Sequence, residues 1–151
     1  MARSGTAIPV PPTPTIGRDH DIDQVLKILD RARVVTLLGT GGVGKTRVAL
    51  EVALRWSAGV ACFVDLTKVR QTELVPGLIA RELGAHNAST ADARQILEEA
   101  LRGRPATLLV LDNFEHVIEA ADIITAMVQW APELKVLATS RARLRHGRAH
   151  L

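Results

Sequence analysis

A glycine-rich segment between an apolar run and a helical pattern constrains this fold more than any other feature. Residues 39–46 read GTGGVGKT and satisfy the pattern G-x-x-x-x-G-K-[ST] at every position. Glycines let the backbone approach a ligand without a Cβ in the way, so successive N–H groups can converge on phosphate oxygens. The pattern belongs between a buried strand and a helix. The segment therefore predicts a strand, a phosphate-binding loop and a helix in that order.

The residues on either side supply that context. Residues 34–38 read VVTLL, a continuous apolar run typical of a strand that is covered on both faces. Apolar residues return at helical spacing over residues 45–56, and the start of such a helix favours an anion. Lys45 is the residue expected to place its charge between the β- and γ-phosphates. The hydroxyl of Thr46 is expected to ligate Mg²⁺.

The rest of the chain alternates between the same two patterns. Further strands are predicted over residues 60–66, 107–111 and 135–139, and further helices from residue 19 and over 73–83, 90–101 and 115–130. Thr72 and Thr90 are the predicted first residues or caps of two of these helices. Strands that alternate with helices imply a parallel sheet covered on both faces. We therefore expect a three-layer α/β fold.

A second motif strengthens the prediction. Residues 108–112 read LLVLD, an apolar strand that ends in an acid. Ligands of parallel sheets bind at the carboxyl ends of the strands, where the glycine-rich loop also lies. Asp112 is therefore expected to hold the Mg²⁺ shell, the Walker B role. The alternative is an ordinary turn residue at the end of a strand.

Composition and charge narrow the class of protein. The chain has 151 residues, 47% hydrophobic and 23% charged, as expected of one folded domain. No stretch approaches the ~20 apolar residues of a membrane span, so a cytoplasmic protein without a membrane partner is expected. Cys62 lies in an apolar run and is expected to be buried and unreactive. Basic residues gather after residue 134, but no recognition helix or aromatic platform for nucleic acid accompanies them.

Four motifs together resemble the NB-ARC type of nucleotide-binding module, found in the signal-transduction (STAND) P-loop ATPases. They are residues 16–19 (IGRD), 37–46 (LLGTGGVGKT), 109–116 (LVLDNFEH) and 136–141 (VLATSR). The similarity extends from residue 16 to about residue 145, with the motifs in the family's order and approximate spacing. Within the family, the chain looks most like the ATPase part of large bacterial LuxR-type transcriptional regulators.

The resemblance implies an ASCE-type domain that binds ATP or ADP with Mg²⁺ and acts as a nucleotide switch with slow hydrolysis. The implied cofactor-binding residues are Gly17, Arg18, Gly39, Thr40, Gly41, Gly42, Val43, Gly44, Lys45, Thr46 and Arg47. Gly17 and Arg18 match the stretch near the adenine and ribose. The implied catalytic residues are Lys45, Asp112, Glu115 and Arg141, and the implied metal ligands are Thr46 and Asp112. Arg141, with Thr139 and Ser140, matches the sensor strand that reports the γ-phosphate.

The chain departs from the family pattern directly after the Walker B acid. Many relatives place a second acid there, whereas this chain has Asn113, and Glu115 is the next acid. Either Glu115 orients the hydrolytic water, or hydrolysis is very slow and the domain works chiefly as a switch. Glu115 also fits a plain role as an acid in the first turn of a helix.

The resemblance also implies a sheet of order 2-3-4-1-5, followed by a helical lid and a winged helix. Only four strands are recognised in this chain, so we expect the fifth to be missing and the strand at residues 34–38 to form an exposed edge suited to self-association. The expected organisation is a disordered proline-rich segment (1–15), an incomplete nucleotide-binding domain (16–145) and a basic tail (146–151). DNA binding would belong to domains outside this chain.

Two other hypotheses stay open at this stage. One is a truncated P-loop domain without independent activity, and the other is a small-molecule kinase. A kinase needs an acceptor site and a mobile lid rich in arginine, and neither is evident between the motifs. The nucleotide base cannot be read from the loop, because backbone contacts see only phosphates; adenine is implied by the resemblance alone.

Overall fold

The computed structural model describes residues 8, 19–39, 43–85, 92–141 and 149–150. In these residues one parallel sheet has the strand order β2-β3-β4-β1-β5. The strands are β1 (Val34–Leu38), β2 (Val60–Asp65), β3 (Thr107–Asp112), β4 (Leu134–Ser140) and β5 (Ala149–His150). The α/β fold and the relative order of the four longer strands are as predicted.

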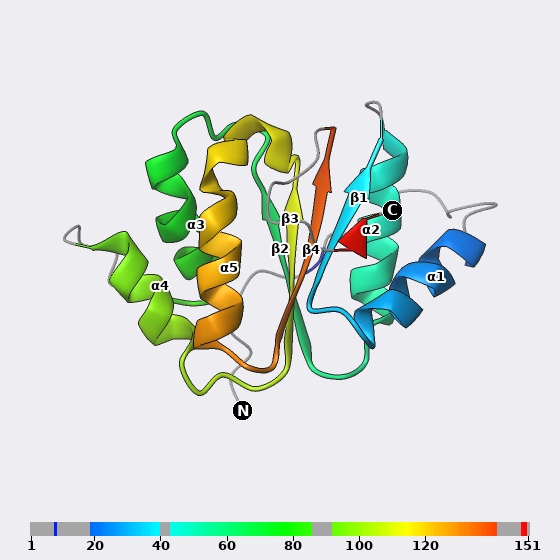
Figure 1. Cartoon of the computed structure of the whole chain (residues 1–151), viewed down its shortest axis with the longest axis horizontal. Helices are drawn as coiled ribbons and strands as arrows, with labels where there is room; N and C mark the ends of the chain where they lie inside the picture. Colours follow the sequence, from blue (N-terminus) through cyan, green and yellow to red (C-terminus); the bar gives the residue numbers. More distant parts are fainter. Residues whose placement is uncertain (1–7, 9–18, 40–42, 86–91, 142–148, 151) are drawn as a thin grey trace.

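Helices cover both faces of the sheet, which gives the three expected layers (Figure 1). The helices α1 (Asp19–Leu29) and α2 (Val43–Arg55) lie on one face. On the other face lie α3 (Val75–Glu82), α4 (Ala93–Leu101) and α5 (Ala121–Trp130). Because the strands are parallel, the carboxyl ends of β1, β3 and β4 lie together at one end of the sheet, where the arrowheads point in Figure 1.

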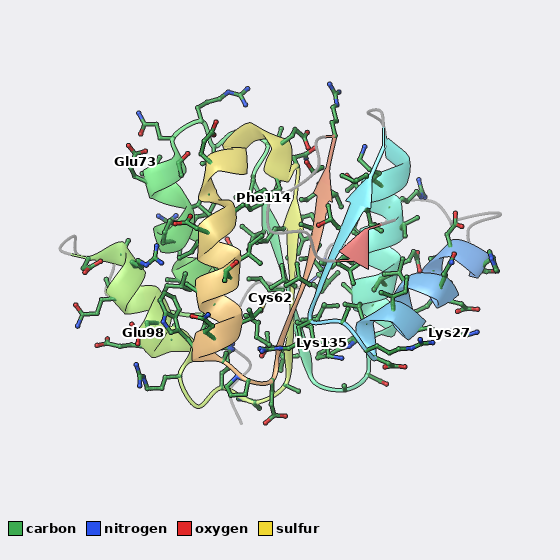
Figure 2. The ribbon with its side chains drawn as sticks, in the orientation of Figure 1. Lys27, Cys62, Glu73, Glu98, Phe114 and Lys135 are labelled. Carbon is green, nitrogen blue, oxygen red and sulfur yellow. The ribbon has the colours of Figure 1, made fainter. Side chains whose placement is uncertain are left out.

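Each face of the sheet has its own apolar core. Val35 and Leu37 pack with α1 and α2, whereas Val34 belongs to the cluster under α3, α4 and α5. This alternation explains why β1 reads as a continuous apolar run, since both of its faces are buried. Phe114, directly after β3, is fully buried in the second cluster (Figure 2). Cys62 is buried there too, and burial raises the pKa of its thiol, as expected of an unreactive cysteine.

At the opposite end of the sheet, two basic side chains form hydrogen bonds between neighbouring elements. The Lys135 ammonium of β4 donates to the Leu29 carbonyl at the end of α1 (Figure 2). The Arg33 guanidinium donates to the Ala131 carbonyl and, at 3.2 Å from Nη2, to the Leu134 carbonyl. Carbonyls at helix ends lack partners within the helix, and a cation there is favourable. These contacts fix the start of β1 against β4.

Three helix boundaries differ from the predictions. The segment predicted as a helix over 73–83 begins as a 3₁₀ turn, η1 (Thr72–Leu74), and Thr72 is not its cap. The α-helix α3 starts only at Val75, next to Pro76, whose missing N–H costs little in a first turn. The long helix predicted over 115–130 is a 3₁₀ helix, η2 (Phe114–Ala120), followed by α5. In α4 the cap is Asp92, which accepts from the Gln95 N–H at 3.3 Å, and Thr90 lies outside the described residues.

The strand β5 corrects the prediction that the fifth strand is missing. Ala149 and His150 pair in parallel with Val35 and Thr36 of β1, so this part of the β1 edge is not open. Two residues of the predicted basic tail therefore belong to the sheet. A strand of two residues carries no periodicity from which it could have been predicted. At the other end of the chain, Ile8 packs against the cluster of α1 and α2, and the rest of segment 1–15 lies outside the described residues.

Candidate functional site

The site lies where the loop after β1 meets the start of α2, beside the carboxyl ends of β3 and β4. Gly39 directly follows β1, and α2 begins at Val43, so the first N–H groups of the helix have no partner inside it. Those groups and the helix dipole favour an anion at this position. Gly17, Arg18, Thr40, Gly41 and Gly42 lie outside the described residues.

The side chain of Lys45 lies against Gly39. Its ammonium donates to the Gly39 carbonyl at 2.8 Å. A Cβ on Gly39 would lie 3.5 Å from the Lys45 Cδ and 3.8 Å from its Nζ, so the lysine stem lies close against the backbone. An ammonium has three N–H donors, and within the part of the chain that the structure describes Gly39 takes one of them, so two can serve a ligand. The lysine is thus held beside the site with donors to spare.

Thr46 and Asp112, the two predicted metal ligands, lie side by side. The Thr46 hydroxyl is 3.1 Å from each carboxylate oxygen of Asp112, although the residues are 66 positions apart. Asp112 has only 3% of its surface exposed. The contact joins the start of α2 to the end of β3 and gathers three hard oxygen atoms at one point, of the kind that Mg²⁺ prefers.

Two more donors hold the Asp112 carboxylate. The Thr139 hydroxyl of β4 donates to Asp112 Oδ1 at 2.6 Å, and the Asn113 amide nitrogen donates to Oδ2 at 3.1 Å. The Asn113 backbone N–H in turn donates to the Thr139 hydroxyl at 2.9 Å. The sequence singled out Asn113 only as a missing acid. The structure places it as a hydrogen-bond donor to the predicted metal ligand.

Opposing effects act on the ionisation of Asp112. Burial raises the pKa of the Asp112 carboxyl, while the hydrogen bonds from Thr139 and Thr46 lower it. The nearby carboxylates of Asp65 and Glu115 add to the rise, and the net result is a pKa above the ordinary value. A cation at this carboxylate would offset both the burial and the repulsion.

Glu115 and Arg141 meet, but through the backbone of the arginine. The Arg141 N–H donates to Glu115 Oε1 at 3.1 Å, which joins η2 to the end of β4. The Arg141 residue is exposed, and Ser140 before it is buried. The Glu115 carboxylate therefore has a structural partner in the residue that the motifs assign to the sensor. Nothing in the sequence signalled this pairing, because it depends on β3 and β4 being neighbours.

Three further predicted residues lie at the start of α2, and one of them, Gly44, lines a cavity. Val43 and Gly44 open α2, and Arg47 is half-buried in its first turns. A cavity of about 250 Å³ lies between α1 and the start of α2, and Gln24, Gly44 and Lys45 are among its lining residues. A ligand held on the loop could therefore extend toward α1. Among the described residues, no group of three or more His, Cys, Asp or Glu side chains could hold a metal, and no helix could cross a membrane.

The comparisons with known protein sequences agree with the motifs. The family described as "AAA domain" matches residues 28–145. A Mycobacterium bovis protein named as an HTH-type transcriptional regulator is 38% identical over 116 residues, covering 76% of this chain and 13% of the relative. A Mycobacterium tuberculosis protein named only as uncharacterized is 32% identical over 147 residues, covering 85% of this chain and 33% of the relative. The chain thus spans only 13% of the length of the first of these relatives.

Solved structures share the fold at low sequence identity. The Walker-type ATPase PABY2304 of Pyrococcus abyssi superposes with a TM-score of 0.60 and 11% identity, covering 84% of this chain and 45% of that one. A STAND protein with a tetratricopeptide repeat sensor from Pyrococcus horikoshii gives a TM-score of 0.60 and 15% identity, covering 99% of this chain and 24% of that one. The predicted P-loop ATPase fold is therefore confirmed.

Proposed function

The chain belongs to the AAA domain family of P-loop ATPases, and from this premise we propose that it binds Mg-ATP and Mg-ADP as a nucleotide switch with slow hydrolysis. The contact of the Thr46 hydroxyl with both oxygens of the Asp112 carboxylate, at 3.1 Å each, supports the proposal most directly. It joins the helix of the phosphate-binding loop to the strand with the predicted metal-holding acid. A glycine-rich turn that binds nothing would not require this pairing.

The oxygen donors at this contact fit a magnesium ion. Mg²⁺ is usually held by one or two carboxylates together with phosphate oxygens and water, and seldom by a cage made only of protein ligands. Thr46 and Asp112 would hold the ion from the protein side. When bound, Mg²⁺ would neutralise charge on the β- and γ-phosphate oxygens.

The residues around the loop bind and orient the phosphates. The free N–H groups at the start of α2 would donate to phosphate oxygens, and the Lys45 ammonium would turn its remaining donors to the same oxygens. Thr139 and Asn113 hold the Asp112 carboxylate in its orientation toward Thr46. These groups are in place before any ligand arrives, which lowers the cost of ordering them on binding.

The proposal of slow hydrolysis rests on Asn113 and Glu115, which lie at or near the position where many relatives have a second acid. Asn113 occupies the position after the Walker B acid, and its amide donates to Asp112 and cannot take a proton. The Glu115 carboxylate accepts the Arg141 N–H. General-base catalysis contributes roughly 10²–10⁴-fold, so if Glu115 serves the Arg141 contact rather than the attacking water, the site would hydrolyse ATP slowly and persist in each nucleotide state.

We also propose that the domain serves as the ATPase part of a transcriptional regulator. The support is the 38% identity to mycobacterial proteins named as HTH-type transcriptional regulators, of which the matched region is 13%. In such an arrangement the nucleotide state would bias how neighbouring domains close on the site. Contact with DNA would then be made by a domain other than this one.

Isothermal titration of Mg-ADP into the wild type and Lys45→Ala tests nucleotide binding. Removing the ammonium deletes charge-assisted hydrogen bonds, so the affinity of Lys45→Ala should fall about 10- to 100-fold. Lys27→Ala is the matched control, since Lys27 is an exposed lysine of α1 away from the loop (Figure 2). Unchanged affinity in Lys45→Ala would refute the assignment of the loop.

A further inference from the structure

A chain of hydrogen bonds continues from Asp112 to the turn after β2. Asp65 and Asp112 are partners in the register of β2 and β3 and end their strands side by side. The Asn113 amide nitrogen donates both to Asp112 Oδ2 at 3.1 Å and to the Thr67 hydroxyl oxygen at 2.6 Å. The Thr67 hydroxyl and its N–H donate to Asp65 Oδ1, the latter at 2.9 Å. Two carboxylates at neighbouring strand ends are thus joined through an amide and a hydroxyl.

The donor and acceptor groups present determine the direction of each hydrogen bond between Asp112 and Asp65. The Asn113 amide nitrogen can only donate, so the Thr67 hydroxyl oxygen must accept from it. The single hydroxyl proton of Thr67 is then directed to Asp65. The carboxylates of Asp112 and Asp65 accept at the two ends of this series of hydrogen bonds, and the Asn113 amide between them supplies the donors. An acid at position 113 could not donate to either neighbour, so the pattern requires an amide there.

From this geometry, and resting on the proposed function, we infer that Asn113 is a positioning residue that orients Asp112 for the metal and couples its occupancy to the Asp65–Thr67 turn. Hydrogen-bonded partners of metal-binding carboxylates set the orientation of the ligand, and their loss typically lowers metal affinity about 10- to 100-fold. Asn113 contacts Asp112 directly and reaches Thr67 with its other donor. Binding or release of the metal would therefore change the hydrogen bonding of the turn after β2.

The backbone at Asn113 is held independently of its side chain. Its N–H donates to the Thr139 hydroxyl at 2.9 Å, and the Asp112 carbonyl accepts from the Leu66 N–H at 2.9 Å. The φ angle of Asn113 is 65°, in the left-handed region that glycine adopts without strain and alanine does not. Asn113→Gly therefore removes the side-chain amide while it keeps the backbone geometry, which makes it the appropriate variant.

The test compares ADP affinity with Mg²⁺ and with EDTA, and takes the ratio of the two affinities for each full-length variant. Asn113→Gly should lower this ratio about tenfold and leave the affinity in EDTA unchanged, because the loop and Lys45 are untouched. Thr67→Val, which removes the hydroxyl but keeps the shape, should lower the ratio by less. Thr67→Ser retains the hydroxyl and should restore the wild-type ratio.

Hydrogen exchange supplies a readout that does not depend on hydrolysis. The Thr67 N–H donates to Asp65, so its exchange reports the state of the turn. Mg-ADP should slow this exchange in the wild type, whereas ADP in EDTA should not. In Asn113→Gly the two ligands should have the same effect.

Each outcome of these experiments decides a separate claim. An unchanged Mg²⁺ ratio in Asn113→Gly, with a normal ratio in the wild type, overturns the positioning role and leaves the proposed function standing. Equal losses with and without Mg²⁺ also overturn it, since they indicate a merely structural role. If Asn113→Gly does not fold, Thr67→Val decides by the same criterion. A wild type that binds no nucleotide overturns both the inference and the proposed function.

Discussion

At the scale of single residues, the carboxylate of Asp112 connects more of the site than any other side chain described above. It accepts hydrogen bonds from Thr46, Thr139 and Asn113, which come from α2, β4 and the end of β3. Because the carboxylate is buried, these hydrogen bonds lie in a low-dielectric environment, where each is stronger than it would be in water. The same burial disfavours its charge, which raises its pKa.

This raised pKa has a consequence for stability without Mg²⁺. The folded state holds the Asp112 proton at pH values where the unfolded chain has released it, so stability is lost as pH rises from the ordinary carboxyl range through the raised pKa of Asp112. Asp112→Asn removes this titration. Urea unfolding of both proteins across the acidic range should show the wild type losing stability relative to Asp112→Asn as pH rises. Parallel pH profiles would contradict this account.

Glu115→Gln separates the two roles left open for Glu115. Glutamine keeps an oxygen that can accept the Arg141 N–H, but it cannot accept a proton from water. We expect nucleotide affinity to be retained and the slow hydrolysis rate to change by less than about tenfold, because the carboxylate serves the backbone contact. A loss of about 10²–10⁴-fold in single-turnover hydrolysis would identify Glu115 as the general base instead.

The sequence predicted part of the site and missed the rest for a physical reason. The roles of Lys45, Thr46 and Asp112 could be predicted because each residue belongs to a short contiguous motif that is typical of phosphate or metal binding. The contacts of Asn113 with Thr67 and of Glu115 with Arg141 join segments 46 and 26 positions apart. They depend on strand neighbours and register, which no local pattern encodes. An Asn directly after a strand-ending Asp was the only signal, and it was interpreted as the absence of an acid.

At the scale of elements, strands were predicted better than helices. The four long strands lie within about one residue of the predicted ranges, because burial on both faces produces apolar runs with clear limits. Helix starts were less accurate. A 3₁₀ turn and an α-helix place apolar side chains at similar spacings, so η1 and η2 were not distinguished from the helices that follow them.

Two glycines allow a matched test of element packing. A Cβ on Gly59 would lie 2.1 Å from the Ala106 carbonyl oxygen, which accepts the Val60 N–H where β2 joins β3. Gly59→Ala should therefore destabilise the domain by about 1–3 kcal/mol. A Cβ on Gly77 in α3 would meet only Ala93 Cβ at 3.6 Å, so Gly77→Ala should stabilise by up to ~1 kcal/mol through helix propensity. Urea unfolding checks both signs, and equal effects would contradict the packing described here.

At the scale of the whole molecule, strand order brings the site together. Because β4 lies between β1 and β3, the Thr139 hydroxyl at the end of β4 reaches the Asp112 carboxylate at the end of β3, which Thr46 of α2 contacts directly. The prediction of this order came from family resemblance, and the sheet confirms it. The prediction of an open β1 edge did not allow for β5, which pairs with Val35 and Thr36.

Thermal unfolding of the whole chain, alone and with Mg-ADP, Mg-ATP or Mg-GTP, tests the central claim most directly. A ligand that binds only the folded site stabilises it by about 2.7 kcal/mol at a concentration one hundred times its Kd. We predict a cooperative transition whose midpoint rises with Mg-ADP and Mg-ATP and rises less with Mg-GTP. In Lys45→Ala the rise with Mg-ADP should be much smaller than in the wild type, as its weaker affinity requires. A cooperative transition that none of these nucleotides shifts would contradict the assignment of a nucleotide-binding site.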